Sequence, residues 1–327
     1  MSLRLPTRLL LRICLPIALC LGALGAAHAT YPERPIRFVV AYAAGGATDS
    51  LARAVSERLA SEFKQPVVVD NRAGGGGTIA AEQVARAQPD GHTLLVTDTQ
   101  YVITPYLIPK LSFDPKKDLV PVTLMASMPV YVAVKTSAGI HSINELVTRA
   151  RGNPGKLSYG SAGVGSLHHI AMEAFKQSAR LHVVHIPYRG SGQSIAGFLA
   201  GDVDVLVASM SAIAPHVKAG TVKLLASSGG TRAPQSPDVP SLSEVVPGYD
   251  YSTEIGVFAP AGTPRDVIEK LQATVAAVLK SPSLTERVTH SMGGAVVGST
   301  SEAYQRNVQH NLDRYSTVVK ASGAKLD

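Results

Sequence analysis

The stretch that decides the fold is AYAAGGATDSLARAV, Ala41 to Val55, which joins the apolar run IRFVV to residues with helical spacing. A glycine-rich turn between a buried strand and a helix is typical of parallel α/β proteins. Gly45 and Gly46 leave the backbone uncovered, and the turn contains no Lys, Arg, His or Cys. Because a helix N-terminus offers unpaired N–H groups and a partial positive charge, we expect this turn to bind an anion through its backbone. The Thr48 hydroxyl is expected beside it, and Asp49 is expected to close the turn by accepting N–H bonds.

Short apolar runs alternate with helical patterns along most of the chain. The first set has expected strands at 36–41, 67–70 and 93–97 and expected helices at 48–63 and 78–87. The second set has expected strands at 157–160, 182–187, 203–208 and 222–227 and expected helices at 166–179, 191–200 and 212–219. A short strand at 255–259 and a long helical stretch from about residue 264 complete the chain. This order predicts an α/β fold with mixed, mostly parallel sheets covered by helices on both faces.

The chain is long enough for two Rossmann-like domains, because a single core rarely keeps growing beyond about 250–300 residues. The segment SSGGTRAPQSPDVP, rich in Gly, Pro and Ser, interrupts the second set of units. We expect domain 1 to comprise residues 30–127 and 229–327, and domain 2 to comprise residues 128–228. The chain would leave domain 1 near Ser127 and return near Ser228, so two connections would form a hinge, each at the end of a strand.

The first 29 residues have the pattern of a signal peptide. Three arginines precede a short apolar run at 13–24, and Ala27-His28-Ala29 forms an A-x-A cleavage signal, so we expect export and cleavage after Ala29. A membrane anchor is disfavoured because a spanning helix needs about 20 apolar residues. A lipoprotein anchored at Cys20 is disfavoured because bulky Leu19 precedes it.

Cleavage would change the composition of the chain. Both cysteines, Cys14 and Cys20, would leave with the signal peptide, which excludes a disulfide, a thiol nucleophile and a thiolate metal site from the exported protein. The net charge of +7 would fall to +4 with the loss of Arg4, Arg8 and Arg12. With no Trp and no cluster of Lys and Arg, the sequence also argues against nucleic-acid binding.

Four strand-to-helix junctions carry glycine-rich loops with a Ser or Thr placed to cap the next helix. They lie at 43–49, 71–78, 160–166 and 188–194. In parallel α/β sheets such loops gather at the carboxyl edge of the strands, so two loops from each domain should face one crevice.

The loops match known catalytic and cofactor motifs only in part. Gly75, Gly77 and Ala80 match G-x-G-x-x-A, and Asp98 follows the next strand as a dinucleotide site requires, but export disfavours a nicotinamide cofactor. No loop has the Lys of a phosphate-binding P-loop. Ser161 lies in YGSAG, where Tyr159 replaces the first glycine of a hydrolase elbow.

Histidines and arginines near the loops are candidate metal ligands or ligand contacts. His168, His169 and Glu173 share a helical turn, but the sequence has no three-ligand metal spacing such as H-E-x-x-H, so we expect no metal. His169 is close enough to the third loop to donate a hydrogen bond into the crevice. Arg72 and Arg189 are expected at the solvated rim, with contact to an anionic ligand as the alternative.

Six blocks of the sequence closely resemble the Bug family, the periplasmic solute receptors of tripartite tricarboxylate transporters. The resemblance covers nearly the whole exported chain in order, in the blocks AYAAGGATDSLAR, VVVDNRAGGGGTIAAEQVARAQPDGHTLL, YGSAGVGSLHHIAMEAF, HIPYRGSGQSIAGFLAGDVDVLV, APHVKAGTVKLLA and SPDVPSLSEV. It implies a fold like that of type II periplasmic binding proteins, in which two domains on a two-strand hinge close around one small carboxylate as a Venus flytrap does.

The resemblance also implies a set of ligand-binding residues. In the family, backbone amides and ordered water hold the ligand carboxylate, and more variable side chains meet the far end of the ligand. Carried over to this chain, the ligand-binding set is Tyr42, Gly45, Gly46, Thr48, Asp49, Gly75, Gly76, Thr99, Gln100, Ser161, Gly165, Ser166, His169, Tyr188 and Ala208.

Two departures from the family pattern affect the expected ligand. The chain has Ala44 where the family often has Pro, and Ala208 where it often has an Asp that could accept a ligand ammonium. We therefore expect a nitrogen-free mono- or dicarboxylate, or an aromatic acid. The resulting hypothesis is a monomeric, non-catalytic periplasmic receptor without cofactor or metal that delivers its ligand to transporter membrane subunits. The alternative is an exported α/β enzyme acting on a small anion.

Overall fold

A computed structural model describes residues 31–325 of the 327-residue chain. The predicted signal peptide at 1–29 lies outside the described residues. Residues 34–327 group as a unit separate from the residues before them, and the description below concerns this unit. Within residues 31–325, none of the helices combines the length and the apolar character needed to cross a membrane.

The first set of βα units forms as the apolar pattern predicts. Glycine-rich loops follow β1 and β2. Strand β1 is buried at four of its five positions because helices cover both faces of the sheet. The elements are β1 (Ile36–Val40), α2 (Ala47–Phe63), β2 (Val67–Asn71), η1 (Gly75–Gly77), α3 (Thr78–Ala85), β3 (Thr93–Thr97), α4 (Gln100–Ile103) and η2 (Thr104–Tyr106).

The second set follows a long strand, β4 (Leu119–Lys135). Its elements are η3 (Thr136–Ala138), α5 (Ile143–Gly152), β5 (Ser158–Ser161), α6 (Leu167–Ala179), β6 (Val184–Pro187), α7 (Ser191–Ala200), β7 (Val205–Ser209), α8 (Met210–Lys218) and β8 (Val222–Ser227). Helix α5 was not predicted from the apolar pattern. Its first turn begins at an N-cap, because the Ser142 side chain accepts a hydrogen bond from the Glu145 N–H.

The C-terminal part is less continuous than the predicted helical stretch. It comprises η4 (Leu242–Glu244), β9 (Ser252–Pro260), α9 (Arg265–Leu279), α10 (Pro282–Glu286), η5 (Arg287–Ser291), β10 (Ala295–Val296) and α11 (Ser301–Ser322). The stretch from residue 264 is broken where β10 pairs with Ser127 and Ala126 of β4. The predicted helical stretch is therefore divided into α9, α10 and α11.

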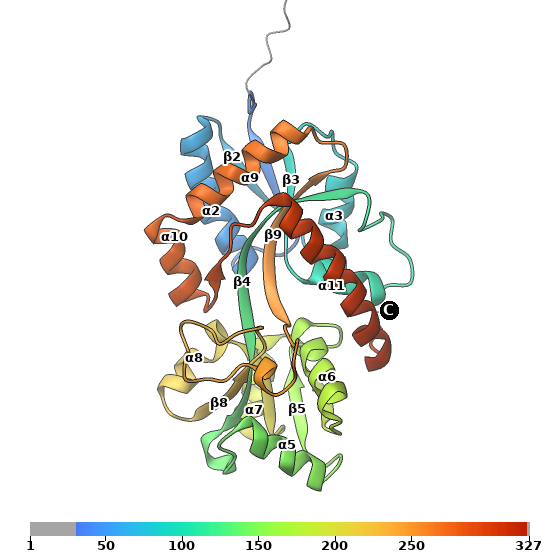
Figure 1. Ribbon diagram of the computed structural model, residues 1–327, viewed down its shortest axis with the longest axis vertical. Helices are drawn as coiled ribbons and strands as arrows, with labels where there is room; N and C mark the ends of the chain where they lie inside the picture. Colours follow the sequence, from blue (N-terminus) through green and yellow to red (C-terminus); the bar gives the residue numbers. More distant parts are fainter. Residues whose placement is uncertain (1–30, 326–327) are drawn as a thin grey trace, which may run out of the picture. The chain divides into compact units, whose positions relative to one another are not determined.

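The strand pairings confirm the predicted mixed α/β fold. The order is β2-β1-β3-β9-β4-β7-β5-β6, with β8 and β10 also pairing with β4. Strands β1, β2 and β3 pair in parallel, as do β5, β6 and β7, whereas each antiparallel pair of the described strands contains β4 or β9. Figure 1 shows β4 and β9 as long strands running between these two parallel groups.

We call the elements around β1–β3 the first half and those around β5–β8 the second half. Residues 119–129 of β4 pair with β9, and residues 130–135 pair with β7 and β8. Ser127 thus lies inside a continuous strand, so the prediction that the chain crosses at the end of a strand was wrong there. The return does follow a strand end, because Ser228 comes directly after β8 and its N–H donates to the Val130 carbonyl.

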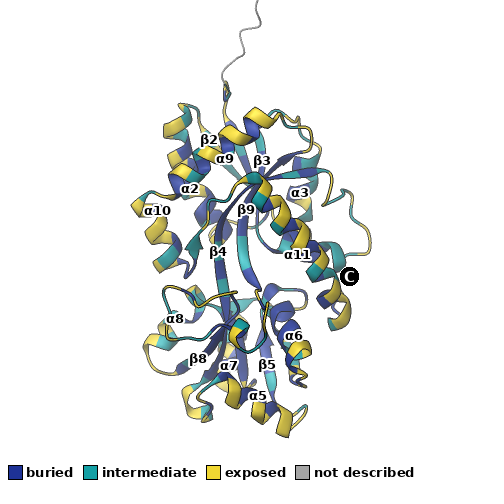
Figure 2. Cartoon of the chain, viewed as in Figure 1, coloured by how far each residue is buried: buried dark blue, intermediate teal, exposed yellow. Residues whose placement is uncertain are grey.

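The hydrophobic core lies along these strands. Phe38, Leu94 and Leu95 of the first half and Tyr131, Tyr159 and Phe198 of the second half are completely or almost completely buried. Figure 2 shows most of β4 and β5 in the buried class and the outward faces of α9, α10 and α11 in the exposed class. The loops at the carboxyl ends of the strands are therefore carried by a rigid, fully packed frame.

Candidate functional site

The first glycine-rich loop closes on itself through Asp49, as predicted. The Gly45 N–H donates to Asp49 Oδ2 at 2.9 Å, and Gly45 has a positive φ of 93° that favours glycine. Asn71 Nδ2 and Arg53 Nε donate to the same carboxylate at 2.9 and 3.1 Å. Burial alone would raise the pKa of Asp49, but these hydrogen bonds outweigh it and hold the pKa below its ordinary value. The Gly45 N–H is consequently used inside the loop and is not available to a ligand.

Helix α2 begins without a side-chain cap. Its N-cap residue is Gly46, whose φ of −75° is open to any residue. Thr48 does not cap the helix, because its hydroxyl donates instead to Asp98 Oδ2 at 3.3 Å. The first N–H groups of a helix have no intrahelical partner, so the start of α2 presents unpaired donors beside an exposed glycine.

Asp98, at the end of β3, organises the loops of the first half. It accepts the Tyr42 hydroxyl at 2.6 Å and the Gln100 N–H at 2.9 Å in addition to the Thr48 hydroxyl. Burial raises the pKa of Asp98, and these donors only partly offset the shift. The position of Asp98 directly after a buried strand is the sequence signal for this role.

Gln100 joins loops from both halves. Its Nε2 donates to the Thr104 hydroxyl at 3.1 Å and to the Gly165 carbonyl of the second half at 3.3 Å. The Thr104 hydroxyl in turn donates to the Gly76 carbonyl at 3.1 Å. A Cβ on Gly165 would approach Leu107 Cδ1 to 2.5 Å, so the absence of a side chain allows this contact. The first, second and third glycine-rich loops therefore lie together.

The third loop, at 160–166, is held mainly by its own side chains. Ser166 caps α6 by accepting the His169 N–H, and its hydroxyl donates to the Gly163 carbonyl at 2.7 Å. His169 Nδ1 accepts the Gly165 N–H at 3.2 Å. Ser161 Oγ lies 2.7 Å from His185 Nε2. The imidazole rings of His169 and His185 stack with their centroids 4.0 Å apart.

The histidines near this loop are uncharged at neutral pH. Burial lowers the pKa of His168 to about 4. Burial and the neighbouring His169 and Lys176 lower the pKa of His185 to about 3. Burial also lowers the pKa of His169. The loop therefore contributes hydrogen-bonding groups rather than cationic side chains.

The predicted Ser or Thr caps are confirmed at only one of the four loops. Ser166 caps α6, whereas α2, α3 and α7 begin at Gly46, Gly77 and Gly190 with no side-chain hydrogen bond. In the second loop the Thr78 hydroxyl donates to the Gly75 carbonyl instead.

Three residues of the predicted set lie beside the joined loops but turn their side chains to other partners, and the Tyr188 N–H still donates to the Ser161 carbonyl of the third loop. The Thr99 hydroxyl bonds to the backbone of β9. The Tyr188 ring packs over Gly197 of α7, and the Ala208 side chain is buried in the apolar cluster with Tyr131.

Burial separates the remaining predicted residues into three classes. The side chains of Thr48, Asp49, Ser161 and His169 are at most 4% exposed. The glycines of the first two loops, Gly45, Gly46, Gly75 and Gly76, are exposed. Tyr42, Gln100 and Ser166 are half-buried. Buried side chains thus support the loops, and the most exposed part of the predicted set is glycine backbone.

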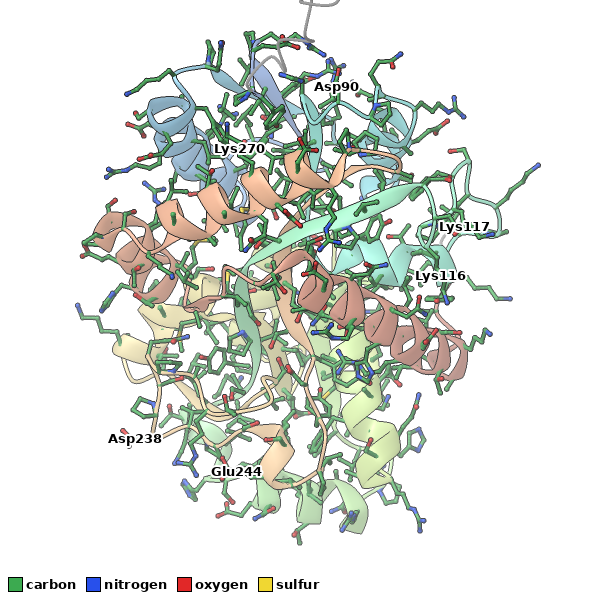
Figure 3. The ribbon with its side chains drawn as sticks, turned by 45° about the horizontal axis from the view of Figure 1, so that its top comes forward. Asp90, Lys116, Lys117, Asp238, Glu244 and Lys270 are labelled. Carbon is green, nitrogen blue, oxygen red and sulfur yellow. The ribbon has the colours of Figure 1, made fainter. Side chains whose placement is uncertain are left out.

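The arginines near the first two loops are paired with carboxylates. Arg53 bonds to Asp49, and Arg72 bonds to Asp70. Farther away, the labelled Asp90, Lys116, Lys117 and Glu244 of Figure 3 point outward and pair with Arg34, Asp313, Asp114 and Arg232. Residues 31–325 contain no group of three His, Cys, Asp or Glu side chains arranged to hold a metal ion.

Comparison with known proteins gives concordant matches. The family model described as the tripartite tricarboxylate transporter family receptor matches residues 51–324. BugT of Bordetella pertussis is 31% identical over 323 residues, which cover 98% of this chain and 99% of BugT. A solved R. palustris protein with adipate is 33% identical with a TM-score of 0.75, covering 90% of this chain and 100% of that chain. MatC from Rhodopseudomonas palustris, solved with bound malate, is 31% identical with a TM-score of 0.72, covering 88% and 100%.

Proposed function

The chain belongs to the tripartite tricarboxylate transporter receptor family, and from this premise we propose that it is a periplasmic receptor for a small carboxylate. The ligand would be captured between the two halves and delivered to the membrane subunits of a tripartite transporter. Export with cleavage after Ala29 would place the protein where such a receptor acts.

The observation that carries this proposal is the exposed backbone at the start of α2. Gly46 is accessible, has no side chain and leaves the first N–H groups of a 17-residue helix without a side-chain cap. Such a helix start attracts a carboxylate through its N–H groups and its dipole. The exposed Gly75 and Gly76, held close by Thr104, would form a neighbouring wall.

The second half would close over the ligand with the loop at 160–166. Gly165 and Ser166 are its parts nearest the first half, because Gln100 already reaches the Gly165 carbonyl. Ser161 and His169 would keep this loop in shape rather than touch the ligand, since both side chains are buried and bonded within the second half. Tyr42 and Thr48 would act in the same way on Asp98.

The two halves would act as the domains expected from the sequence, residues 30–127 with 229–327 and residues 128–228. Ligand binding would shift an open ensemble toward a closed one, because the ligand would contact both loops only in the closed form. The membrane subunits would recognise that closed form, with the receptor acting as a monomer.

A nitrogen-free acid is the favoured ligand. Ala208 is buried in an apolar cluster, so it provides no acceptor for a ligand ammonium. The related R. palustris proteins were solved with adipate and with malate. Dicarboxylates of this size are therefore the first compounds to test, followed by monocarboxylates and aromatic acids.

An exported hydrolase is the alternative, and the Ser161–His185 contact of 2.7 Å is the feature that favours it. Two observations weigh against that role. The Ser161 side chain is 0% exposed, so a substrate does not reach its hydroxyl. A pKa near 3 makes His185 a poor general base at neutral pH. We therefore propose that the protein catalyses no reaction.

A thermal-shift screen over adipate, malate, other carboxylates and aspartate tests the proposal. Ligand at about 100 times its Kd should add about 2.7 kcal/mol to the free energy of unfolding. Mass spectrometry of the recovered ligand should find it unchanged. No shift with any carboxylate, or conversion of the ligand, would refute the receptor, and a preference for aspartate would refute the nitrogen-free ligand class.

A further inference from the structure

Two paired strands, β4 and β9, connect the two halves. Glu254, Thr253 and Ser252 of β9 pair with Ser127, Met128 and Pro129 of β4. One residue further along, β4 changes partner and pairs with Ser209 of β7. If the halves move as the proposed function requires, this short piece of β9 must bend or twist.

A single hydroxyl group ties this piece of β9 to the loop after β3. The Thr99 hydroxyl donates to the Ser252 carbonyl at 2.9 Å and accepts the Glu254 N–H at 2.7 Å. Thr99 is only 4% exposed, so water does not readily replace either bond. Its chain neighbours are Asp98, which holds Tyr42 and Thr48, and Gln100, which reaches Gly165 of the second half.

A side chain of the same segment is fixed to helix α11. The Glu254 carboxylate accepts Asn307 Nδ2 at 3.0 Å and Asn311 Nδ2 at 2.8 Å. Arg314 donates to Asn311 Oδ1 at 2.7 Å and lies over the Tyr251 ring at 4.4 Å. A Cβ on Gly256 would clash with the Tyr304 ring, so α11 also packs tightly against β9 just beyond Glu254. The β9 segment is therefore held by α11 through the Glu254 side chain and by the Thr99 hydroxyl through its backbone.

We propose that Thr99 is a positioning residue that couples the hinge strand to the ligand loops, and that it does not contact the ligand itself. This inference rests on the proposed function in that it assumes movement of the two halves. Bending of β9 at Ser252–Glu254 moves the Thr99 hydroxyl, and Thr99 carries Asp98 and Gln100 with it. The Gln100–Gly165 contact thereby forms or breaks together with the bend, and Thr99 sets the balance between open and closed forms.

The test compares Thr99→Val, which keeps the shape of the side chain but removes both hydrogen bonds, with Thr99→Ser, which restores the hydroxyl. Thr263→Val is the matched control, because the Thr263 hydroxyl also donates to a β9 carbonyl, that of Pro260, at the far end of the strand. Spin labels at Val68→Cys and Val184→Cys, both exposed, report the distance between the halves. The expected signal peptide contains both native cysteines, so no other thiol competes for the labels in the exported protein.

In ligand-free protein, Thr99→Val should shift or broaden the label distance distribution and speed exchange of the Glu254 amide at least about tenfold, because that amide loses its acceptor. Thr99→Ser should restore both readouts, and Thr263→Val should leave both unchanged. Faster amide exchange with an unchanged distance distribution would overturn the proposal, since Thr99 would then only fix the strand locally. An unchanged amide exchange rate would overturn it as well. These readouts use no ligand, so failure of the carboxylate screen is a separate result.

Discussion

The starts of helices α2 and α6 are alike in sequence and different in bonding. Each follows a glycine-rich loop at the carboxyl end of a strand in a parallel pair. At α6, the Ser166 hydroxyl accepts the His169 N–H and the His169 imidazole accepts the Gly165 N–H. At α2, Gly46 provides no side-chain cap, and the nearest acid, Asp49, bonds to Gly45 before the helix begins.

This difference indicates separate tasks for the two loops. A helix start that satisfies its own N–H groups is a stable support, whereas a start with unpaired N–H groups beside an exposed glycine is ready to bind an anion. We propose that the first half supplies the anion-binding site and that the second half supplies a preformed loop that closes over it. The predictions below test that division.

Gly46→Val should have the largest effect. The added side chain would cover the start of α2 and weaken carboxylate binding at least about 100-fold, or about 2.7 kcal/mol. The fold should persist, because a Cβ at this position meets no atom closer than the Ala43 carbonyl at 3.9 Å. Isothermal titration with the carboxylate found by the screen measures the affinity.

Gly152→Val is the control for Gly46→Val. Gly152 is the last residue of α5, and an added Cβ there also meets open space. Its affinity should equal that of the wild type. Full affinity in the Gly46→Val protein would show that the anion-binding site is not at the start of α2.

Asp49→Asn should destabilise the first loop at neutral pH by about 2 kcal/mol, because hydrogen bonds to a charged group are lost. The pKa of Asp49 is depressed in the folded protein, so its contribution is present above the ordinary value of 3.8 and is lost as the pH falls below it. Urea unfolding at pH 7 and at about pH 3 should therefore show a large difference between the two proteins at pH 7 and a smaller one at low pH.

Asp98→Asn provides the opposite case. Burial raises the pKa of Asp98, so the stability that this carboxyl contributes falls as the pH rises. The difference from wild type should change with pH in the opposite sense to that of Asp49→Asn. Parallel pH profiles for the two variants would contradict the assignment.

Ser166→Ala should have the smallest effect of the four variants, and the effect should fall on stability. Loss of the α6 cap should cost about 1 kcal/mol in urea unfolding, while carboxylate affinity stays within about threefold of wild type. A large loss of affinity with unchanged stability would mean that the Ser166 hydroxyl reaches the ligand, and the two loops would then share the anion-binding site.

Much of the fold was predictable from local pattern. The strands of both parallel groups are short apolar runs, and their predicted positions agree with β1–β3 and β5–β8 to within a few residues. The resemblance to the Bug family is likewise confirmed by the family match and by BugT. Strand β4 was not recognised as one element, because its two parts pair with different strands and no local pattern records that change.

The candidate site was predictable only in part. Glycine-rich loops are visible in a sequence because their residue types are local. Which side chains support the loops is not visible, because that depends on distant neighbours. Asp98, for example, is shared by Tyr42 and Gln100, and the Thr99 hydroxyl bonds to a strand more than 150 residues away along the chain.

The sequence by itself determined the alternation of strands and helices, the position of the glycine-rich loops and the backbone character of the expected anion-binding site, because periodicity and glycine content act over a few residues. Only the tertiary structure decided that Ser166 caps its helix while Gly46 leaves its helix uncapped, and that Thr99 faces the hinge strand. Hydrogen-bond partners are fixed when distant segments pack together, so the same loop composition leads to a closed helix start in one half and an open one in the other.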